Sequence, residues 1–528
     1  MNYMKNLLFA LLLIVTGNLA AQSMPGDPDS TFNGTGRVIL DNGYLDLYQD
    51  VKIMADGKIV AVGTTYDAVY ASDMQVTRLL NDGTYDPAFG TNGVFRYHLG
   101  YETGGYACQV KDNGSILVAG ISMDDFGGFA MLLLQITDKG ELDTTFGEDG
   151  IAYYDYGPGE DIAYALALQE DDKILLAGHI TNDDFRHVPA VVRFTEEGLV
   201  DSTFGEDGLA TIPVTETDNE FAGVQVQPDG KIVAAGHISN GLSWFSLLMA
   251  RFDENGVPDA TFGTDGIINM DIGNVDDEFF DLRLTSSGDI IATGFTTTQG
   301  DFNFHLLVMK FDENGDLVPE FGEEGMVIWG ETSYNVGYAM EILPDDKIVV
   351  AGSSGEKAPM DSDWGIWKFN SDGSFDETFG NNGIVTTDAT GEFDEALGIA
   401  VQEDGKLVAA GKFRMENNIN FGVIRYQNEL TVSVSEVTEK HVVTVMPNPV
   451  RSDGNINIAM ELNESQSISI EILNMAGSVV MERSPGHQPE GMFMDSFGLD
   501  SELSAGIYFI RVTGSKSAFM NRKVMVIE

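Results

Sequence analysis

A short run of the form Asp-x-x-Phe-Gly-x-x-Gly recurs seven times along this 528-residue chain, at intervals of 57 to 59 residues, with Asn33 in place of the first Gly in the first copy and Val318 in place of the Asp in the sixth. Its phenylalanines are Phe32, Phe89, Phe146, Phe204, Phe262, Phe321 and Phe379. A second run, DGKIVAVG in its first copy, alternates with it and ends at Gly63, Gly120, Gly178, Gly236, Gly294, Gly352 and Gly411. Two signals in constant phase indicate one supersecondary unit repeated seven times, each burying its apolar face against its neighbours.

The repeat from residue 208 to residue 266 predicts four strands, at 209–214, 221–227, 231–236 and 246–252. An Asp-Gly turn between two apolar runs is a strong hairpin signal, so each repeat is expected to be an antiparallel meander. We expect the Phe-Gly run to join the fourth strand of one sheet to the first strand of the next. The Ala-Gly pairs in the third strands should let neighbouring sheets approach closely. Seven such sheets predict an all-β, seven-bladed β-propeller of four-stranded antiparallel blades, with an open β-solenoid as the alternative.

The repeats resemble the delta-60 repeat family of secreted bacterial proteins. The resemblance rests on copies such as DSTFGEDGLA at 201–210 and DGKIVAAG at 229–236, and it covers residues 29 to 426. It implies a propeller fold and no agreed activity.

The first residues are typical of a secretory signal peptide. Lys5 precedes the apolar run of residues 7–15, and the small residues Ala20 and Ala21 follow it. We therefore expect a signal peptide at 1–21, a propeller at 22–428, a linker at 429–440 and a small C-terminal β-sandwich at 441–528. No later segment reaches the roughly 18 to 20 apolar residues of a membrane helix, so we expect an exported chain without a membrane span.

The last 85 or so residues change character, with period-two alternation in ISIEIL, IYFIRV and RKVMVI. They resemble the type A sorting domain of the type nine secretion system of Bacteroidetes, although Asn474 stands where such tails often have Asp. The residues that carry this resemblance are Pro447, Asn448, Pro449, Gly477, Gly506, Tyr508 and Lys523. The resemblance implies binding to the secretion and sorting machinery, passage across the outer membrane, and then either release or attachment to the cell surface.

The composition excludes some classes of partner. The 29 basic and 83 acidic residues give a formal net charge of −54, which argues against nucleic acid because phosphate binding needs a basic surface. Cys108 is the only cysteine, so no intrachain disulfide can form. We expect a folded monomer that is held together by packing alone.

Propeller geometry separates the repeated turns from the loops that differ between blades. The Phe-Gly and Asp-Gly turns should share one face, and the variable loops the other, where binding residues usually lie on a rigid frame. Aromatic and acidic side chains in these loops suit a glycan or protein ligand. The predicted binding face comprises Asp124, Asp125, Phe126, Asp184, Phe185, Trp244, Phe302, Asp363 and Trp364.

An oxygen-bearing residue stands 17 positions before each repeated glycine. The seven are Asp46, Thr103, Asp161, Asn219, Asp277, Asn335 and Asp394. We favour hydrogen bonding to the local backbone as their role, with a collar that holds calcium, above all through the four aspartates, as the alternative. His179 and His237 follow the repeated glycine in two adjacent copies, where a zinc pair is conceivable.

No Ser-His-Asp or Cys-His arrangement is evident, and calcium is the one cofactor that the sequence raises. We expect a secreted or surface-attached propeller that binds an extracellular glycan or protein. A glycan-cleaving hydrolase or lyase is the alternative, and it should show carboxylates or histidines converging on one pocket. A purely structural surface component is the third candidate.

Overall fold

The computed structural model describes most of the chain in segments. These are residues 23–43, 45–67, 71–99, 102–123, 128–157, 159–213, 218–239, 241, 244–298, 303–330, 334–355, 362–388, 393–415, 418–428, 444–446, 450–451, 454–462, 465–473, 479–499, 506–514 and 518–527. The expected signal peptide lies outside them. The chain divides into two compact units, Met1–Thr431 and Val432–Glu528. The described residues contain no apolar helix of the length needed to cross a bilayer.

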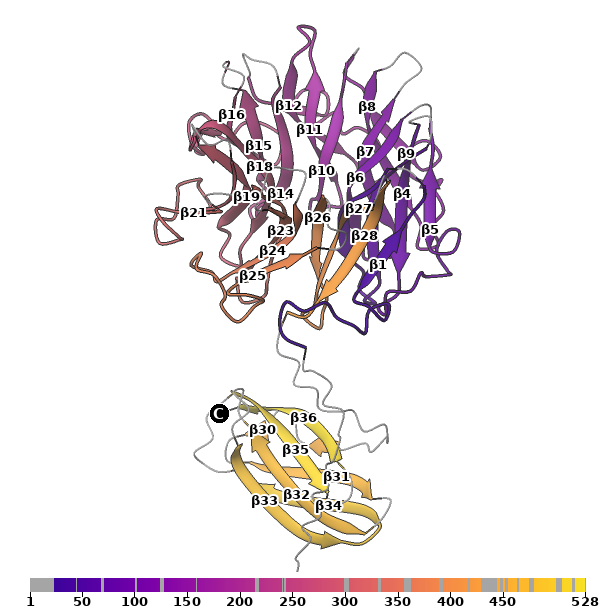
Figure 1. Cartoon of the computed structure of the whole chain (residues 1–528), viewed down its shortest axis with the longest axis vertical. Helices are drawn as coiled ribbons and strands as arrows, with labels where there is room; N and C mark the ends of the chain where they lie inside the picture. Colours follow the sequence, from indigo (N-terminus) through magenta and orange to yellow (C-terminus); the bar gives the residue numbers. More distant parts are fainter. Residues whose placement is uncertain are drawn as a thin grey trace, which may run out of the picture. The chain divides into compact units, whose positions relative to one another are not determined.

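The first unit consists of seven four-stranded antiparallel sheets, which we number as blades 1 to 7 along the chain (Figure 1). The inner strands are β2 (Asp46–Ile53), β6 (Thr103–Val110), β10 (Ile162–Leu168), β14 (Glu220–Val226), β18 (Asn274–Leu284), β22 (Tyr334–Ile342) and β26 (Asp394–Val401). The second strands are β3 (Ile59–Tyr66), β7 (Ile116–Met123), β11 (Ile174–Thr181), β15 (Ile232–Ser239), β19 (Ile290–Thr298), β23 (Ile348–Gly355) and β27 (Leu407–Met415). The third strands are β4 (Ser72–Leu79), β8 (Phe129–Ile136), β12 (His187–Phe194), β16 (Phe245–Phe252), β20 (Phe304–Phe311), β24 (Asp363–Phe369) and β28 (Asn418–Tyr426). The outer strands are β5 (Val94–Tyr97), β9 (Ile151–Tyr154), β13 (Leu209–Thr211), β17 (Ile267–Met270), β21 (Met326–Trp329), β25 (Ile384–Thr387) and, for blade 7, β1 (Arg37–Leu40).

The ring is closed, which confirms the predicted seven-bladed propeller over the open solenoid. Each inner strand contacts the inner strands of both neighbouring blades, and β26 of blade 7 packs against β2 of blade 1. The N-terminal strand β1 supplies the outer strand of blade 7 by pairing with β28, with Val38 opposite Val423. Figure 1 shows the indigo β1 beside the orange β28. The two ends of the repeat region therefore share one sheet.

The prediction of which strand begins each blade was wrong by one strand. The run at 209–211 pairs with β12 of the preceding blade rather than opening a new sheet. In the same way, β17 pairs with β16, with Ile267 opposite Ala250. The Phe-Gly run therefore connects two adjacent strands of the same blade. Hydrogen bonds such as that from the Arg251 N–H to the Gly266 carbonyl hold these two strands together. The two kinds of repeated turn nevertheless share one face, as predicted.

Each Phe-Gly run ties its own blade to the next one. In blade 4, Asp259 accepts hydrogen bonds from the backbone N–H and hydroxyl of Thr261 and forms an ion pair with Arg251 at 2.9 Å. The Arg251 guanidinium also covers the ring of Phe262 at 4.7 Å and donates to the carbonyl of Glu313 in the next blade. Although burial opposes ionisation, these hydrogen bonds and the Arg251 charge lower the pKa of Asp259 to about 2. The motif is therefore explained by blade packing rather than by ligand binding.

The repeated glycine makes room for a bulge in the inner strand. Its neighbours in the same blade would block a larger residue, since a Cβ atom on Gly236 would lie 2.1 Å from the carbonyl oxygen of Glu220. The glycine of each predicted Ala-Gly pair thus serves its own blade, whereas the small alanine packs against the next one, as Ala235 does in one apolar cluster with Phe279 and Leu282 of blade 5. In every blade the register skips one inner-strand residue directly after the partner of this glycine. The skipped residues, here called the bulge positions, are Gln49, Tyr106, Tyr164, Ala222, Phe280, Tyr338 and Leu397.

The second unit forms two sheets, one of β29-β31-β34 and one of β30-β36-β35-β32-β33. Their strands are β29 (Thr444–Met446), β30 (Val450–Arg451), β31 (Asn455–Leu462), β32 (Gln466–Leu473), β33 (Val479–Gln488), β34 (Gly491–Gly498), β35 (Gly506–Gly514) and β36 (Ala518–Ile527). A single apolar core lies between the sheets and includes Ile458, Ile470 and Tyr508. Gly506 opens β35 and Lys523 lies in β36, opposite Phe509. Pro447, Asn448, Pro449 and Gly477 lie outside the described residues.

Candidate functional site

The inner strands of the propeller enclose a cavity of about 570 Å³. All seven bulge positions line it, so the bulge turns one side chain of each blade into the central channel. Four of the seven are aromatic, and they form two pairs. The rings of Tyr106 and Tyr164 meet edge to face with centroids 5.5 Å apart, and those of Phe280 and Tyr338 lie 5.1 Å apart. Aromatic faces therefore lie on two parts of the channel wall.

Charged side chains line the cavity further along the inner strands, towards the repeated turns. Lys52 pairs with Asp50 at 2.7 Å, and Arg283 pairs with Asp281 and lies 3.6 Å from Glu341. Asp50 and Asp281 each also accept a backbone N–H of the next blade at 2.9 Å. Burial raises the pKa of Asp281 to about 6. Both cations of this group are thus already neutralised by neighbouring carboxylates.

Alternating histidines and glutamates form a row from blade 3 to blade 5, on the side of the bulge positions that is nearer the variable loops. We call it the His–Glu row. It consists of His179, Glu220, His237 and Glu278, and Glu220 lines the cavity. Nδ1 of His179 lies 3.3 Å from Glu220, while Nδ1 of His237 lies 3.9 Å from Glu220 and 3.6 Å from Glu278. The sequence pointed to the two histidines, but the structure places a carboxylate between them and another beside the second.

The two carboxylates of the row occupy different electrostatic surroundings. Burial opposes the ionisation of Glu220, but its contacts with His179 and His237 outweigh burial and lower its pKa. For Glu278, burial and the nearby charges of Glu220 and Asp276 raise the pKa to about 8. At neutral pH one carboxyl group is therefore ionised and its neighbour carries a proton.

Blade 7 carries another buried glutamate, Glu395, at the equivalent strand position. The hydroxyl of Tyr338 donates to Glu395 at 3.4 Å, and Glu395 pairs with Lys412 at 2.7 Å. Glu395 occupies the strand position of Glu220 and Glu278, and Lys412 that of His237. The pair Glu395–Lys412 can therefore be compared with the pair Glu220–His237, from which it differs by a lysine in place of the histidine.

Replacing Glu278 by Gln is expected to stabilise the protein at neutral pH. Because the folded pKa of Glu278 is raised, the folded state keeps a proton that the unfolded chain releases above about pH 4.5, so stability falls as pH rises from about 5 to 8. The variant should lack this loss and gain roughly 2 to 3 kcal/mol at pH 7. Denaturant titrations of both proteins at pH 5 and pH 7.5 measure the difference, and equal pH dependence in the two would contradict it.

The structure corrects part of the predicted loop site. Phe185 is 74% exposed and Asp184 is exposed beside it, whereas Trp244 is half-buried. Trp364 is fully buried, its ring stacked on Phe413 and its Nε1–H donated to the carbonyl of Lys412, so it belongs to the core and not to a binding face. Of the other predicted loop residues, Asp363 is half-buried at the start of β24, whereas Asp124, Asp125, Phe126 and Phe302 lie outside the described residues.

The collar residues contact the local backbone. Asp46 accepts the N–H of Asn42 at 2.7 Å, Asp161 that of Thr181 at 2.9 Å, and Asp277 that of Ile272 at 2.6 Å. Asp394 likewise accepts the N–H of Arg414 at 3.0 Å, and all seven collar side chains are buried. These contacts are the ones expected for the backbone role, whereas calcium at the collar remains a prediction.

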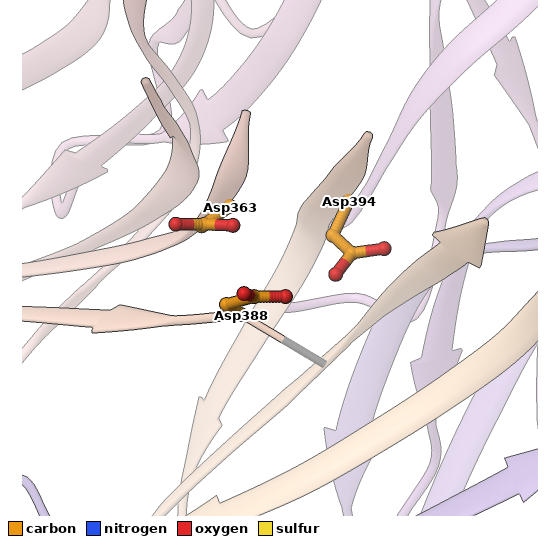
Figure 2. Close-up of side chains that lie close together, drawn as sticks. All are labelled: Asp363, Asp388 and Asp394. Atoms are coloured by element: carbon orange, nitrogen blue, oxygen red, sulfur yellow. The ribbon is translucent and has the colours of Figure 1, made fainter. Parts of the chain in front are cut away.

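In the described part of the chain, one group of three acids could hold a metal ion. It unites Asp363 of the predicted binding face and Asp394 of the collar with Asp388, and their ligand oxygen atoms lie within 4.8 Å of one another (Figure 2). Asp388 went unnoticed in the sequence because it lies outside both repeated runs. Three carboxylates do not by themselves make a calcium site, since calcium takes about six to eight oxygen ligands.

Family models match both units of the chain. Residues 444–527 match the secretion system C-terminal sorting domain. Residues 55–89, 169–204, 227–262 and 343–379 match a β-propeller domain of unknown function, DUF5122. The chain is an exported β-propeller with a C-terminal sorting domain. Its tail directs it through the type nine secretion system to the cell surface or beyond, as the sequence predicted.

Solved structures resemble the chain only distantly, and no curated relative matches it significantly. PorZ, a surface component of the type IX secretion system of Porphyromonas gingivalis, is 10% identical with a TM-score of 0.33, over 90% of this chain and 68% of that one. An ulvan lyase of polysaccharide lyase family 25 is 9% identical with a TM-score of 0.38, over 74% and 96%. A glucose dehydrogenase is 11% identical with a TM-score of 0.36, over 74% and 99%. Similarities this weak carry no information about function.

Proposed function

We propose that this exported propeller binds a neutral glycan in its central channel. The observation that carries the proposal is the convergence of four aromatic bulge residues and several carboxylates on one cavity of about 570 Å³. Aromatic rings stack on the apolar faces of sugar rings, and carboxylates accept hydrogen bonds from sugar hydroxyls. A cavity of this size suits a short stretch of a sugar chain and is too small for a folded protein domain.

The charge distribution favours a neutral ligand. The chain as a whole carries a formal charge of −54, which repels polyanions. The two cations that line the cavity, Lys52 and Arg283, are already paired with aspartates, so a uronate or sulfate group would gain little from them. Neutral polysaccharides are therefore the expected partners, ahead of acidic ones.

Truncating the two tyrosines of the channel wall should weaken binding. We expect Tyr106→Ala and Tyr164→Ala each to lower the affinity of the full chain for its glycan about tenfold to a hundredfold, because each removes an aromatic anchor. Affinity electrophoresis in gels that contain xylan, β-1,3-glucan, galactomannan or polygalacturonate measures this. Phe185→Ala, on an exposed loop, is the matched control and should bind normally. The channel assignment fails if Phe185→Ala loses binding and the tyrosine variants keep it.

A further inference from the structure

A second level of side chains lines the cavity on the side of the repeated turns. It lies three residues after each bulge position, and in five of the seven blades the residue there has a long polar side chain that lines the cavity. We call these five residues the polar level: Lys52, Gln109, Gln225, Arg283 and Glu341. Alanines, Ala167 and Ala400, stand at the equivalent strand position of the other two blades. A glycan that enters past the aromatic bulge residues therefore meets the polar level next.

The charged side chains of the polar level approach one another across the channel. Lys52 belongs to blade 1 and Arg283 to blade 5, on opposite sides of the closed ring. Their side chains are only 22% and 20% exposed, although both line the cavity. Burial opposes the charge of Arg283, but carboxylates of its own blade, of blade 6 and of blade 1 together raise its pKa. The carboxylate from blade 1 is Asp50, so charges from opposite walls act on each other at this level.

Two members of the polar level are free to bind a ligand. Gln109 of blade 2 and Gln225 of blade 4 are half-buried, and neither side-chain amide has a hydrogen-bond partner within the part of the chain that the structure describes. Lys52 and Arg283, by contrast, are already paired with aspartates. An amide both donates and accepts hydrogen bonds, as a sugar hydroxyl does. The two glutamines are therefore the groups of this level that suit a neutral sugar.

We infer that the polar level closes the channel towards the repeated turns, so that the channel binds the end of a glycan chain and not its middle. This inference rests on the proposed binding function. The terminal sugar unit exchanges hydrogen bonds with the amides of Gln109 and Gln225, and the following units lie along Tyr106 and Tyr164. An internal stretch does not fit, because its chain would have to continue through the polar level. The glycan therefore enters from the face of the variable loops.

Binding at chain ends changes how affinity depends on chain length. A linear chain has the same number of ends whether it is short or long, so a polymer offers few sites per unit mass and oligosaccharides offer many. A channel that is open at both sides binds anywhere along a chain, and a longer chain then holds more protein molecules. The number of chain ends at constant mass is therefore the quantity that separates the two cases.

The test uses the full chain and competition in the affinity gels. Xylan, β-1,3-glucan and galactomannan are each compared before and after partial acid hydrolysis, which multiplies the main-chain ends at constant mass. We expect the hydrolysed glycan to compete better in proportion to its number of ends. Calorimetry with size fractions of the glycan that binds should give a number of bound proteins per chain that stays constant as the chain lengthens.

Two variants test the role of the free amides. Gln109→Ala and Gln225→Ala should each weaken binding of the hydrolysed glycan about threefold to tenfold, because each removes hydrogen bonds to the terminal sugar. Both variants should fold, since alanine already occupies this strand position in blades 3 and 7, and thermal unfolding checks this. Gln488→Ala, the same change in the second unit, is the control and should bind like the unsubstituted chain.

The outcomes separate this inference from the proposed function. Competition that depends only on the mass of glycan, or a number of bound proteins that grows with chain length, overturns binding at chain ends and leaves binding in the channel intact. Unchanged affinity in both folded glutamine variants overturns the role given to the polar level. Failure to bind any of these glycans, before and after hydrolysis, overturns the proposed function and this inference with it.

Discussion

A chain shortened to begin at residue 42 is expected to lose cooperative folding. The removed segment supplies β1, which pairs with β28, and the Phe-Gly run that closes blade 7. Its loss leaves the buried Arg425 without Asp29, which lies 2.8 Å away, and empties the site of the fully buried Phe32. An unpaired buried charge and a lost core aromatic cost about 3 to 5 kcal/mol each, which approaches the 5 to 15 kcal/mol by which a typical domain is stable.

Calorimetry and circular dichroism of the shortened chain measure this effect. The control is a chain that ends at Asn428. It lacks the whole C-terminal unit but keeps every strand of the propeller. That chain should retain a sharp thermal transition. If the chain that begins at residue 42 unfolds as cooperatively as the one that ends at Asn428, ring closure by β1 contributes little to stability.

The fold was predictable because the turn chemistry repeats with the blades. The Asp-Gly and Phe-Gly runs require backbone conformations that few residues adopt, and Asn33, which replaces the first glycine in one copy, has a φ of +48°. What the sequence left open was which strands pair across the Phe-Gly run. A period-two pattern identifies a strand but not its neighbour, so the outer strand of one blade was read as the first strand of the next.

The channel site was harder to predict because its residues follow no compositional rule. The bulge positions hold Gln, Tyr, Ala, Phe and Leu in different blades, and the binding hypothesis was placed on loops rich in aromatic residues. A usable signal did exist, since each bulge residue lies 14 positions before a repeated glycine. Comparing the residues at this position would have identified Tyr106, Tyr164, Phe280 and Tyr338 as a set. Only the strand register, however, shows that a bulge directs them into the channel.

Trp364 shows why loop and core aromatics are confused in a sequence. It follows the variable loop of blade 6 and stands next to Asp363, a pattern that also fits an exposed binding loop. In the structure it is the second residue of β24, and its ring faces the inter-blade core with Ile366 and Phe379. One residue of difference in where a strand begins decides whether such a ring is exposed or buried.

Trp364→Ala is accordingly expected to destabilise the propeller strongly. The ring is 0% exposed, stacks on Phe413 at 4.5 Å and donates its Nε1–H to the carbonyl of Lys412 at 3.0 Å. Truncation leaves a large cavity and removes this hydrogen bond, which together should lower the free energy of unfolding by about 3 to 5 kcal/mol. Denaturant titration of the variant beside the unsubstituted chain measures the loss.

Phe185→Ala and Trp364→Phe complete this comparison. Phe185 comes from the same predicted set but is 74% exposed, so its truncation should change stability by no more than about half a kcal/mol. Trp364→Phe keeps the stack on Phe413 and loses the hydrogen bond and part of the ring, so it should fall between the other two variants. Equal stability of the two alanine variants would mean that the Trp364 ring does not fill the core, and the corrected assignment of this residue would then fail.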